Sequence, residues 1–162
     1  MRSWLLGLVA MISGSALAGS GTSPLAIGNA RIDVPPGWVV VSRSADRQVL
    51  QSSDKRQEAT ISLMEFGVAP GPAEFERLCA LRIEAERKFG AVVFPAKPPF
   101  MEDGRWGYFY SGGDKAQGRV FSGFLSLSGR QLITIYVDGR GIDPKLHVAS
   151  FSAWVEAMHW TP

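Results

Sequence analysis

The chain has 162 residues, of which 46% are hydrophobic and 20% charged, and its formal net charge is +2. A chain of this length and composition buries one sizeable core, which excludes an intrinsically disordered protein. Its single cysteine, Cys79, excludes a scaffold held together by several disulfides. The near balance of 17 basic and 15 acidic residues argues against a nucleic-acid-binding protein, which carries a basic stripe.

The first eighteen residues have the pattern of a secretory signal peptide. Arg2 gives a positive start, the apolar run Trp4–Ile12 follows, and residues 16–18 are Ala-Leu-Ala, the small-residue pattern that signal peptidase accepts. The apolar run is about half of the roughly 20 residues that span a bilayer, so we expect no stable membrane insertion. We expect cleavage near Ala18-Gly19 and a periplasmic or secreted mature protein.

Small and polar residues over 19–30 predict a flexible lead-in, and we expect one globular domain over 31–160. The turn-forming residues 35–37, Pro-Pro-Gly, separate the first two expected strands. In the fourth strand the alternate residues from Ala59 to Leu63 share one face, which we expect to lie in the core. Apolar and β-branched patterns predict these early strands over 31–34, 38–41, 48–52 and 58–66.

Two segments have the pattern of helices. Pro72 suits the first turn of a helix, Gly90 its end, and Cys79 is expected to be a small buried residue. The core-facing stripe of this helix is expected to be Phe75, Leu78, Leu81, Ala85 and Phe89. Asp143-Pro144 predicts the start of a second helix. Its core-facing residues are expected to be Val148, Phe151, Val155 and Met158.

The second half of the chain has the pattern of an antiparallel meander. A short strand is expected over 91–94, and three longer strands follow over 105–110, 119–127 and 131–137. Residues 111–114 and 128–130 are expected to be turns, and a Gly-rich connection over 138–142 leads to the second helix. The element order predicts an α+β domain with a mostly antiparallel sheet of about six to seven strands flanked by two helices.

Residues 32–38, Ile-Asp-Val-Pro-Pro-Gly-Trp, resemble the opening segment of the Mog1/PsbP-like superfamily, whose bacterial members include the DcrB-like envelope proteins. The later order is similar as well, with a helix near Phe75, an aromatic strand at 107–109, a long hairpin and a closing helix near Trp154. The resemblance covers residues 31 to 158 and implies α/β/α layering. Because the superfamily consists largely of binding and adaptor modules, it implies no catalytic residues.

The residue patterns of common active sites are absent from the sequence. It has no Gly-x-Ser-x-Gly elbow and no phosphate-binding loop, and carboxylates such as Glu65 and Asp114 are interpreted as solvated loop residues. His147 and His159 are expected about three turns, or roughly 18 Å, apart on one helix, too far to share a metal ion. We therefore expect no enzyme, no cofactor and no metal site. A hydrolase with a hidden acid–base site is the least supported hypothesis.

Aromatic and charged residues of the meander are the best candidates for a binding site. Trp106, Tyr108 and Tyr110 share one face of their strand. If a helix covers that face, they belong to the core; if the face is open, they form an aromatic platform of the kind that supplies binding energy between proteins. The candidate binding residues are Arg105, Trp106, Tyr108, Tyr110, Asp114, Lys115 and Arg119.

These expectations favour an exported, non-enzymatic protein-interaction module with a protein partner in the bacterial envelope, acting as a monomer or a homodimer. An immunity or inhibitor protein against a secreted toxin that acts in the periplasm is the concrete form. Binding is expected through a sheet face or through the loops around Gly112–Lys115 and Asp138–Asp143. The alternative is a small-ligand-binding or envelope-maintenance protein of the DcrB-like type, which predicts an enclosed apolar pocket between sheet and helices.

Overall fold

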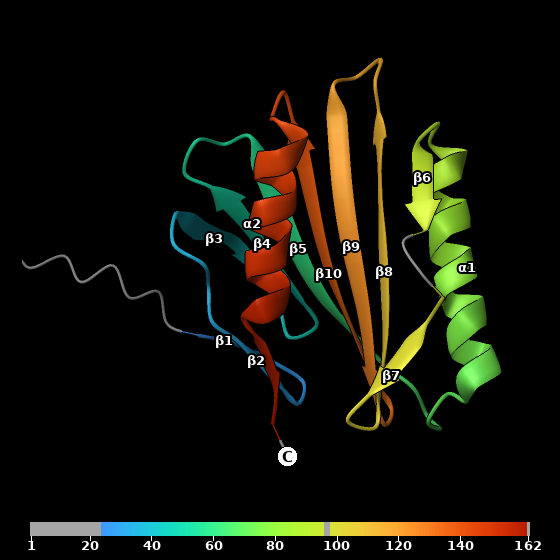
Figure 1. Ribbon diagram of the computed structural model, residues 1–162. Coiled ribbons are helices and arrows are strands. Elements are labelled where there is room, and N and C mark those ends of the chain that lie inside the picture. The colour runs from blue at the N-terminus through green and yellow to red at the C-terminus, as the bar shows by residue number, and fades with distance from the viewer. Residues whose placement is uncertain (1–23, 96–97, 162) are drawn as a thin grey trace, which may run out of the picture.

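A computed structural model describes residues 24–95 and 98–161, so the expected signal peptide lies outside the described residues. Eight strands form one antiparallel sheet, and one helix packs against each of its faces (Figure 1), which confirms the expected α+β class. No helix in the described ranges combines the length and the apolar character needed to cross a membrane.

The helices are α1 (Pro72–Lys88) and α2 (Pro144–Glu156). In spatial order the large sheet contains β3 (Trp38–Arg43), β4 (Arg47–Ser52), β5 (Gln57–Glu65), β10 (Gln131–Arg140), β9 (Arg119–Ser128), β8 (Arg105–Asp114) and β6 (Val92–Pro95), and β7 (Phe100–Glu102) pairs with β8. A small sheet contains β1 (Leu25–Ile27), β2 (Ala30–Ile32) and β11 (Met158–Trp160).

The large sheet has a hydrophobic core on each face. On one face, side chains of β4, β5, β9 and β10 pack with Phe151 and Trp154 of α2. On the other, side chains of β8 and β9 pack with Phe75 and Cys79 of α1. Successive strand residues point to opposite faces, so one strand supplies both cores. The core-facing alternation expected in β5 is confirmed, because Ala59 is fully buried under α2.

Helix α1 begins and ends where the sequence predicts, with Pro72 in its first turn and Gly90, at φ 81°, beyond its last turn. Its buried side differs from the expected stripe, because Leu81 and Phe89 are 49% and 77% exposed. The helix instead faces the sheet with Glu86, whose carboxylate lies 3.7 Å from Arg119 Nη2 of β9. The buried residues of α1 are Phe75, Cys79, Ile83 and Glu86.

Helix α2 also begins where the sequence predicts. The Asp143 carboxylate accepts a hydrogen bond from the Lys145 N–H at 2.7 Å and so caps the helix. Val148, expected in the core, is 55% exposed, because it points sideways toward strands that α2 does not cover. Met158 begins β11 and does not continue the helical stripe. The buried residues of α2 are His147, Phe151 and Trp154.

The expectation of a flexible lead-in is wrong for residues 25–30. Strand β1 pairs with β2, and β2 pairs with β11 near the other end of the chain. Leu25 and Ile27 are 1% and 2% exposed. The Thr161 N–H and hydroxyl both donate to the Asn29 carbonyl at 2.8 Å. The β1–β2 hairpin is itself local, but β11, which holds it in place, comes from the other end of the chain, and a pattern of neighbouring small residues cannot show that contact.

Strands β8 and β10 are longer than predicted. Residues 111–114, expected to be a turn, continue β8, and residues 138–140 continue β10. Glycines inside β8 allow a close approach of the neighbouring chain: a Cβ on Gly112 would lie 2.4 Å from the Val92 carbonyl oxygen and 2.5 Å from the Phe121 ring.

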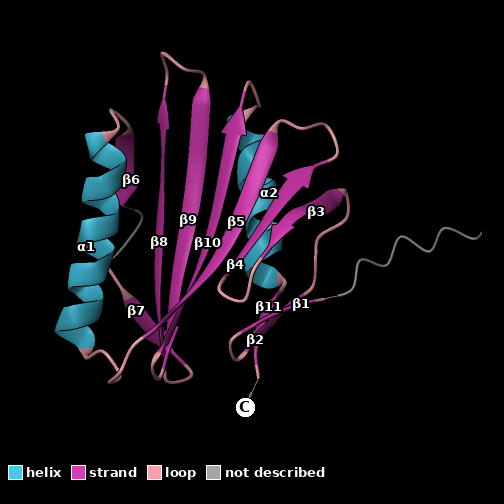
Figure 2. Cartoon of the chain, turned by 180° about the vertical axis from the view of Figure 1, so that it is seen from behind, coloured by secondary structure: helices cyan, strands magenta, loops and turns pink. Residues whose placement is uncertain are grey.

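The two helices are displaced from one another across the sheet. Helix α1 contacts β6 and β8, whereas α2 contacts β9 and β10. Figure 2 shows that α1 covers one edge of its face and leaves β10, β5 and β4 open, with α2 behind the sheet. On the α2 face, the strands toward β6 lie beside the helix and not under it (Figure 1). The candidate sites lie in these two uncovered areas.

Candidate functional site

The aromatic face of β8 belongs to the core. Tyr108 and Tyr110 are 6% and 1% exposed and lie in the core under α1, with their ring centroids 6.3 Å apart. The Tyr110 hydroxyl accepts a hydrogen bond from Arg82 Nε at 2.7 Å, and burial raises the pKa of Tyr110 to about 12. The sequence left open whether a helix covers this face of β8. Helix α1 covers it, so these tyrosines form no exposed platform.

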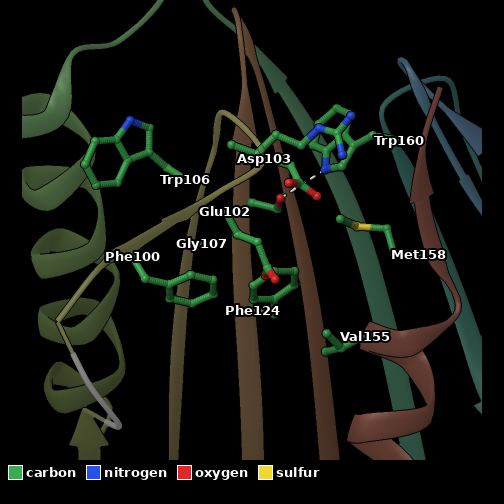
Figure 3. A pocket seen from close by; sticks show the side chains of 11 residues that line it. Phe100, Glu102, Asp103, Trp106, Gly107, Phe124, Val155, Met158 and Trp160 are labelled. Carbon is green, nitrogen blue, oxygen red and sulfur yellow. Dashed lines mark hydrogen bonds between the residues drawn. The ribbon is translucent and has the colours of Figure 1, made fainter. Parts of the chain in front are cut away.

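Arg105 and Trp106 border a small pocket at the first end of β8. The Trp106 ring turns away from this pocket toward α1 (Figure 3), with its centroid 6.0 Å from that of Phe75. Trp160 lies at one side of this pocket, and its indole N–H donates to Ser126 Oγ at 3.1 Å. The pocket volume is about 170 Å³, below the roughly 300 Å³ of typical ligand sites. Arg105 is therefore separated from Asp114, Lys115 and Arg119 by the length of the strand, beside a hollow too small for most ligands.

Asp114, Lys115 and Arg119 lie at the opposite end of the β8–β9 hairpin, beside a larger hollow that we call the α2 trough. The two loops expected to bind a partner meet here, because residues 112–115 line one part of the trough and residues 141–142 another. The trough has a volume of about 670 Å³ and lies between β6 and the first turns of α2. The residues that line it include Val92, Phe94, Ser111, Gly113, Val120, Ile142 and Val148.

The banks of the α2 trough expose apolar side chains. Val92 and Phe94 on β6 are 60% and 61% exposed, and Val148 on α2 is 55% exposed. The floor remains deep because Ser111 and Gly113 have small side chains or none. Exposed apolar side chains that gather around one hollow are typical of a binding surface.

The polar candidates at the rim of the trough have different roles. The Asp114 carboxylate accepts a hydrogen bond from the Ala116 N–H at 2.9 Å and so shapes the hairpin turn. Arg119 points to the other face of the sheet, where its Nε lies 3.0 Å from Asp138 Oδ1. Lys115 is exposed and forms no ion pair with any residue that the structure describes. Of the three, Lys115 alone presents a charge to a partner at this rim.

Three buried side chains form a polar group at the inner wall of the trough. His147 Nδ1 lies 3.2 Å from Gln57 Nε2, and His147 Nε2 lies 3.1 Å from Ser122 Oγ. The Gln57 amide nitrogen only donates, so Nδ1 accepts and Nε2 donates to the hydroxyl. Burial lowers the pKa of His147, which keeps the ring neutral. The group ties β5, β9 and α2 together, whereas His159, expected on the same helix, lies in β11.

A second hollow, which the sequence did not predict, lies between the end of α1 and strands β9 and β10. Glu86 is 6% exposed there, and its carboxylate lies 2.7 Å from Arg82 Nη2 and 3.7 Å from Arg119 Nη2. Of its residues, only Arg119 was a candidate, since no local pattern shows that α1 and β10 meet. This arginine cleft is lined by Arg82, Glu86, Phe89, Gln117, Arg119, Tyr136, Asp138 and Arg140.

Comparisons with known proteins bear on the fold. No family model and no curated protein matches the sequence. The solution structure of cyanobacterial PsbP (CyanoP) from Synechocystis sp. PCC 6803 is similar, with a TM-score of 0.64 and 12% identity, over 95% of this chain and 99% of that chain. A crystal structure from Bacteroides thetaiotaomicron gives a TM-score of 0.45 and 10% identity, over 83% of this chain and 46% of the other. The chain thus has a PsbP-like fold, and the fold expected from the Mog1/PsbP-like resemblance is confirmed.

Proposed function

We propose that this chain is an exported, non-enzymatic protein-interaction module that binds a protein partner in the bacterial envelope through the α2 trough. The observation that carries the proposal is the gathering of exposed Val92, Phe94 and Val148 around a hollow of about 670 Å³. Water-exposed apolar surface of this kind gains free energy when a partner covers it.

The partner supplies an apolar segment with a carboxylate beside it. Apolar side chains of that segment fill the trough between β6 and α2, and the carboxylate pairs with the unpaired Lys115 at the rim. Apolar contacts give most of the affinity, while the charge pair favours one orientation and speeds association. The trough is open along both banks, unlike the enclosed pocket that the DcrB-like alternative predicts, and so favours a protein over a small ligand.

An immunity or inhibitor protein against a toxin that acts in the periplasm is the concrete form of this proposal. Such a protein has to be exported, which the signal-peptide pattern of residues 1–18 supports. It blocks another protein by occupying its surface and needs no chemistry of its own. The polar group around His147 agrees with that role. The ring nitrogen that faces Ser122 donates its hydrogen to the hydroxyl, so it cannot accept the Ser122 proton as the base of a catalytic serine would.

The binding proposal is tested by expressing the whole chain with a C-terminal tag in its own host and identifying copurifying proteins by mass spectrometry. The identified partner is then purified separately, and its Kd is measured. Phe94→Ser and Val148→Ser change side chains that are more than half exposed, so we expect an intact fold and a Kd raised about tenfold or more. Leu81→Ser, which changes a similarly exposed residue on α1, is the matched control. A Kd that neither trough variant alters, or that Leu81→Ser alters equally, contradicts the proposal.

Export is tested separately by fractionation of cells that produce the tagged chain. We expect the protein in the periplasm or the medium, with an N-terminus at Gly19 by sequencing. A protein that stays in the cytoplasm with residues 1–18 attached contradicts the proposal of export. It does not affect the proposal that the α2 trough binds a protein.

A further inference from the structure

The arginine cleft has features that the proposed function does not use. Three guanidinium groups surround it, from Arg82 on α1, Arg119 on β9 and Arg140 at the end of β10. Its volume of about 470 Å³ falls within the range of small-ligand sites. It lies on the α1 face of the sheet, whereas the α2 trough lies on the other face.

Two acids, the buried Glu86 and the partly buried Asp138, hold two of these guanidinium groups in place. Arg82 Nη2 lies 2.7 Å from the Glu86 carboxylate, which is almost fully buried. Arg119 Nε lies 3.0 and 3.1 Å from the two carboxylate oxygens of Asp138, and its Nη2 donates to the Tyr136 hydroxyl. These contacts use Nε and Nη2, and within the described residues the Nη1 group of neither arginine has a hydrogen-bond partner. Two preoriented guanidinium groups therefore keep free donors.

The cleft has an excess of positive charge. Three guanidinium groups face two carboxylates, so one positive charge is left uncompensated. An adjoining hollow, which shares Asp138 and Arg140 with the cleft, adds Lys55 and Arg56 against Glu58. Arg140 is exposed and forms no ion pair in the part of the chain that the structure describes. The buried network is complete without Arg140, whose guanidinium is available to an incoming anion.

Aromatic side chains give the cleft an apolar wall. The Phe89 side chain, 77% exposed at the end of α1, lines the cleft. The Tyr136 ring lies beneath the Arg82 guanidinium, with 4.8 Å between Cζ and the ring centroid. A flat apolar group that enters the cleft can pack against Phe89 while an anionic group on the same molecule meets the arginines.

We infer that the arginine cleft binds a small organic anion, whose carboxylate or phosphate group contacts Arg82, Arg119 and Arg140 and whose apolar part packs on Phe89. Guanidinium groups bind both kinds of anion through charge-assisted hydrogen bonds, often two at a time. Because this site and the α2 trough lie on opposite faces of the sheet, a protein partner and the anion can be bound together.

Titrations of the whole purified protein with sodium phosphate, sodium benzoate and phenyl phosphate test this inference, with backbone amide resonances as the readout. Sodium chloride keeps the ionic strength constant and also serves as the reference titrant. We expect saturable shifts at Phe89, Gln117 and Arg140, and tighter binding of phenyl phosphate than of inorganic phosphate. Benzoate and phenyl phosphate share an aromatic ring and differ in their anionic group, so their two Kd values are compared. A lower Kd for benzoate indicates a carboxylate ligand, and a lower Kd for phenyl phosphate indicates a phosphate ligand. Shifts that grow linearly with every salt, as with chloride, overturn the inference.

Three variants show whether binding occurs in the cleft. Arg140→Gln removes one guanidinium without disturbing the buried network, so the fold is kept and we expect the Kd to rise about tenfold. Arg130→Gln removes an exposed arginine beside the other end of β10 and is the control for net charge. Phe89→Ala should abolish the preference for phenyl phosphate over inorganic phosphate. No effect of Arg140→Gln, or equal effects of both arginine variants, overturns the inference, because binding then ignores the cleft or follows net charge alone.

Discussion

The indole rings of Trp38 and Trp154 meet edge to face, with centroids 5.3 Å apart and planes at 77°. Trp38 begins β3, at the edge of the large sheet, and Trp154 lies near the end of α2. Both side chains are nearly fully buried. The pair therefore fixes α2 across the sheet toward β3, and this position of α2 leaves the trough open on the β6 side.

Replacing Trp38 by Ala should lower the free energy of unfolding by about 3–5 kcal/mol, as other large-to-small core changes do. The change opens a cavity against Trp154, which urea denaturation followed by circular dichroism measures. Trp38→Phe keeps an aromatic contact and should cost less. A loss below about 1 kcal/mol for Trp38→Ala would show that the contact contributes little to holding α2.

Removing the buried carboxylate of the arginine cleft should also destabilise the fold. Glu86→Ala leaves the Arg119 guanidinium, whose side chain is 17% exposed, with less compensating charge, so we expect a loss of about 3 kcal/mol in the free energy of unfolding. Glu84→Ala removes an exposed partner of Lys88 on the same helix and should cost less than about 1 kcal/mol. Similar losses for both variants, measured in urea, would contradict the role given to Glu86.

The stability of the protein should fall as the pH decreases below about 6.5, because of His147. Burial lowers the pKa of His147 in the folded protein, although Asp138 acts in the opposite direction, while the unfolded chain keeps the ordinary value. Between these two pKa values the unfolded chain binds a proton that the folded protein does not, so the free energy of unfolding decreases there and levels off below the folded pKa.

Urea midpoints between about pH 7.5 and 5 check this expectation for the natural protein and for His147→Gln, which does not titrate. The stability advantage of the natural protein over the variant should shrink toward acid pH. An advantage that is constant over this range would show that the buried imidazole does not cause the pH dependence.

The Cys79 thiol should be inert while the protein is folded. It is 2% exposed on the sheet-facing side of α1, and burial raises its pKa to about 12, so almost no thiolate exists at neutral pH. We expect a thiol-reactive aromatic disulfide to leave Cys79 unmodified in native buffer and to react completely in denaturant. Rapid reaction in native buffer would show that α1 opens easily from the sheet.

Local patterns predicted the elements of this fold because most of its signals are local. The cap at Asp143, the proline at position 72 and the alternation in β5 each act within a few residues. The segment at 32–38, together with the element order, was enough to indicate the PsbP-like fold. The prediction failed for residues 25–30, where the hairpin of β1 and β2 is completed by β11, which pairs with β2 from the end of the chain.

The candidate sites were less predictable because burial of polar groups depends on residues far apart in the sequence. Hydrophobicity placed Phe89 in the core-facing stripe of α1, whereas the structure exposes Phe89 and buries the charged Glu86. Glu86 is buried because Arg119 and Tyr136 reach it from β9 and β10, and Tyr136 is 50 positions away. In the same way, the sequence placed Tyr110 on one face of β8 but could not show that α1 covers that face.

Strand β9 separates the two uncovered areas described above, and its alternate side chains serve different sides. Ser122 faces α2 and bonds to His147, whereas Arg119 and Phe121 face α1. A single-residue insertion or deletion in this strand would exchange the two linings. Substitutions that change the α2 trough without changing the arginine cleft, or the reverse, are therefore expected in elements that contact only one face of the sheet. Divergence in what such proteins recognise should accumulate in α1, β6 and α2 before it reaches the shared strand.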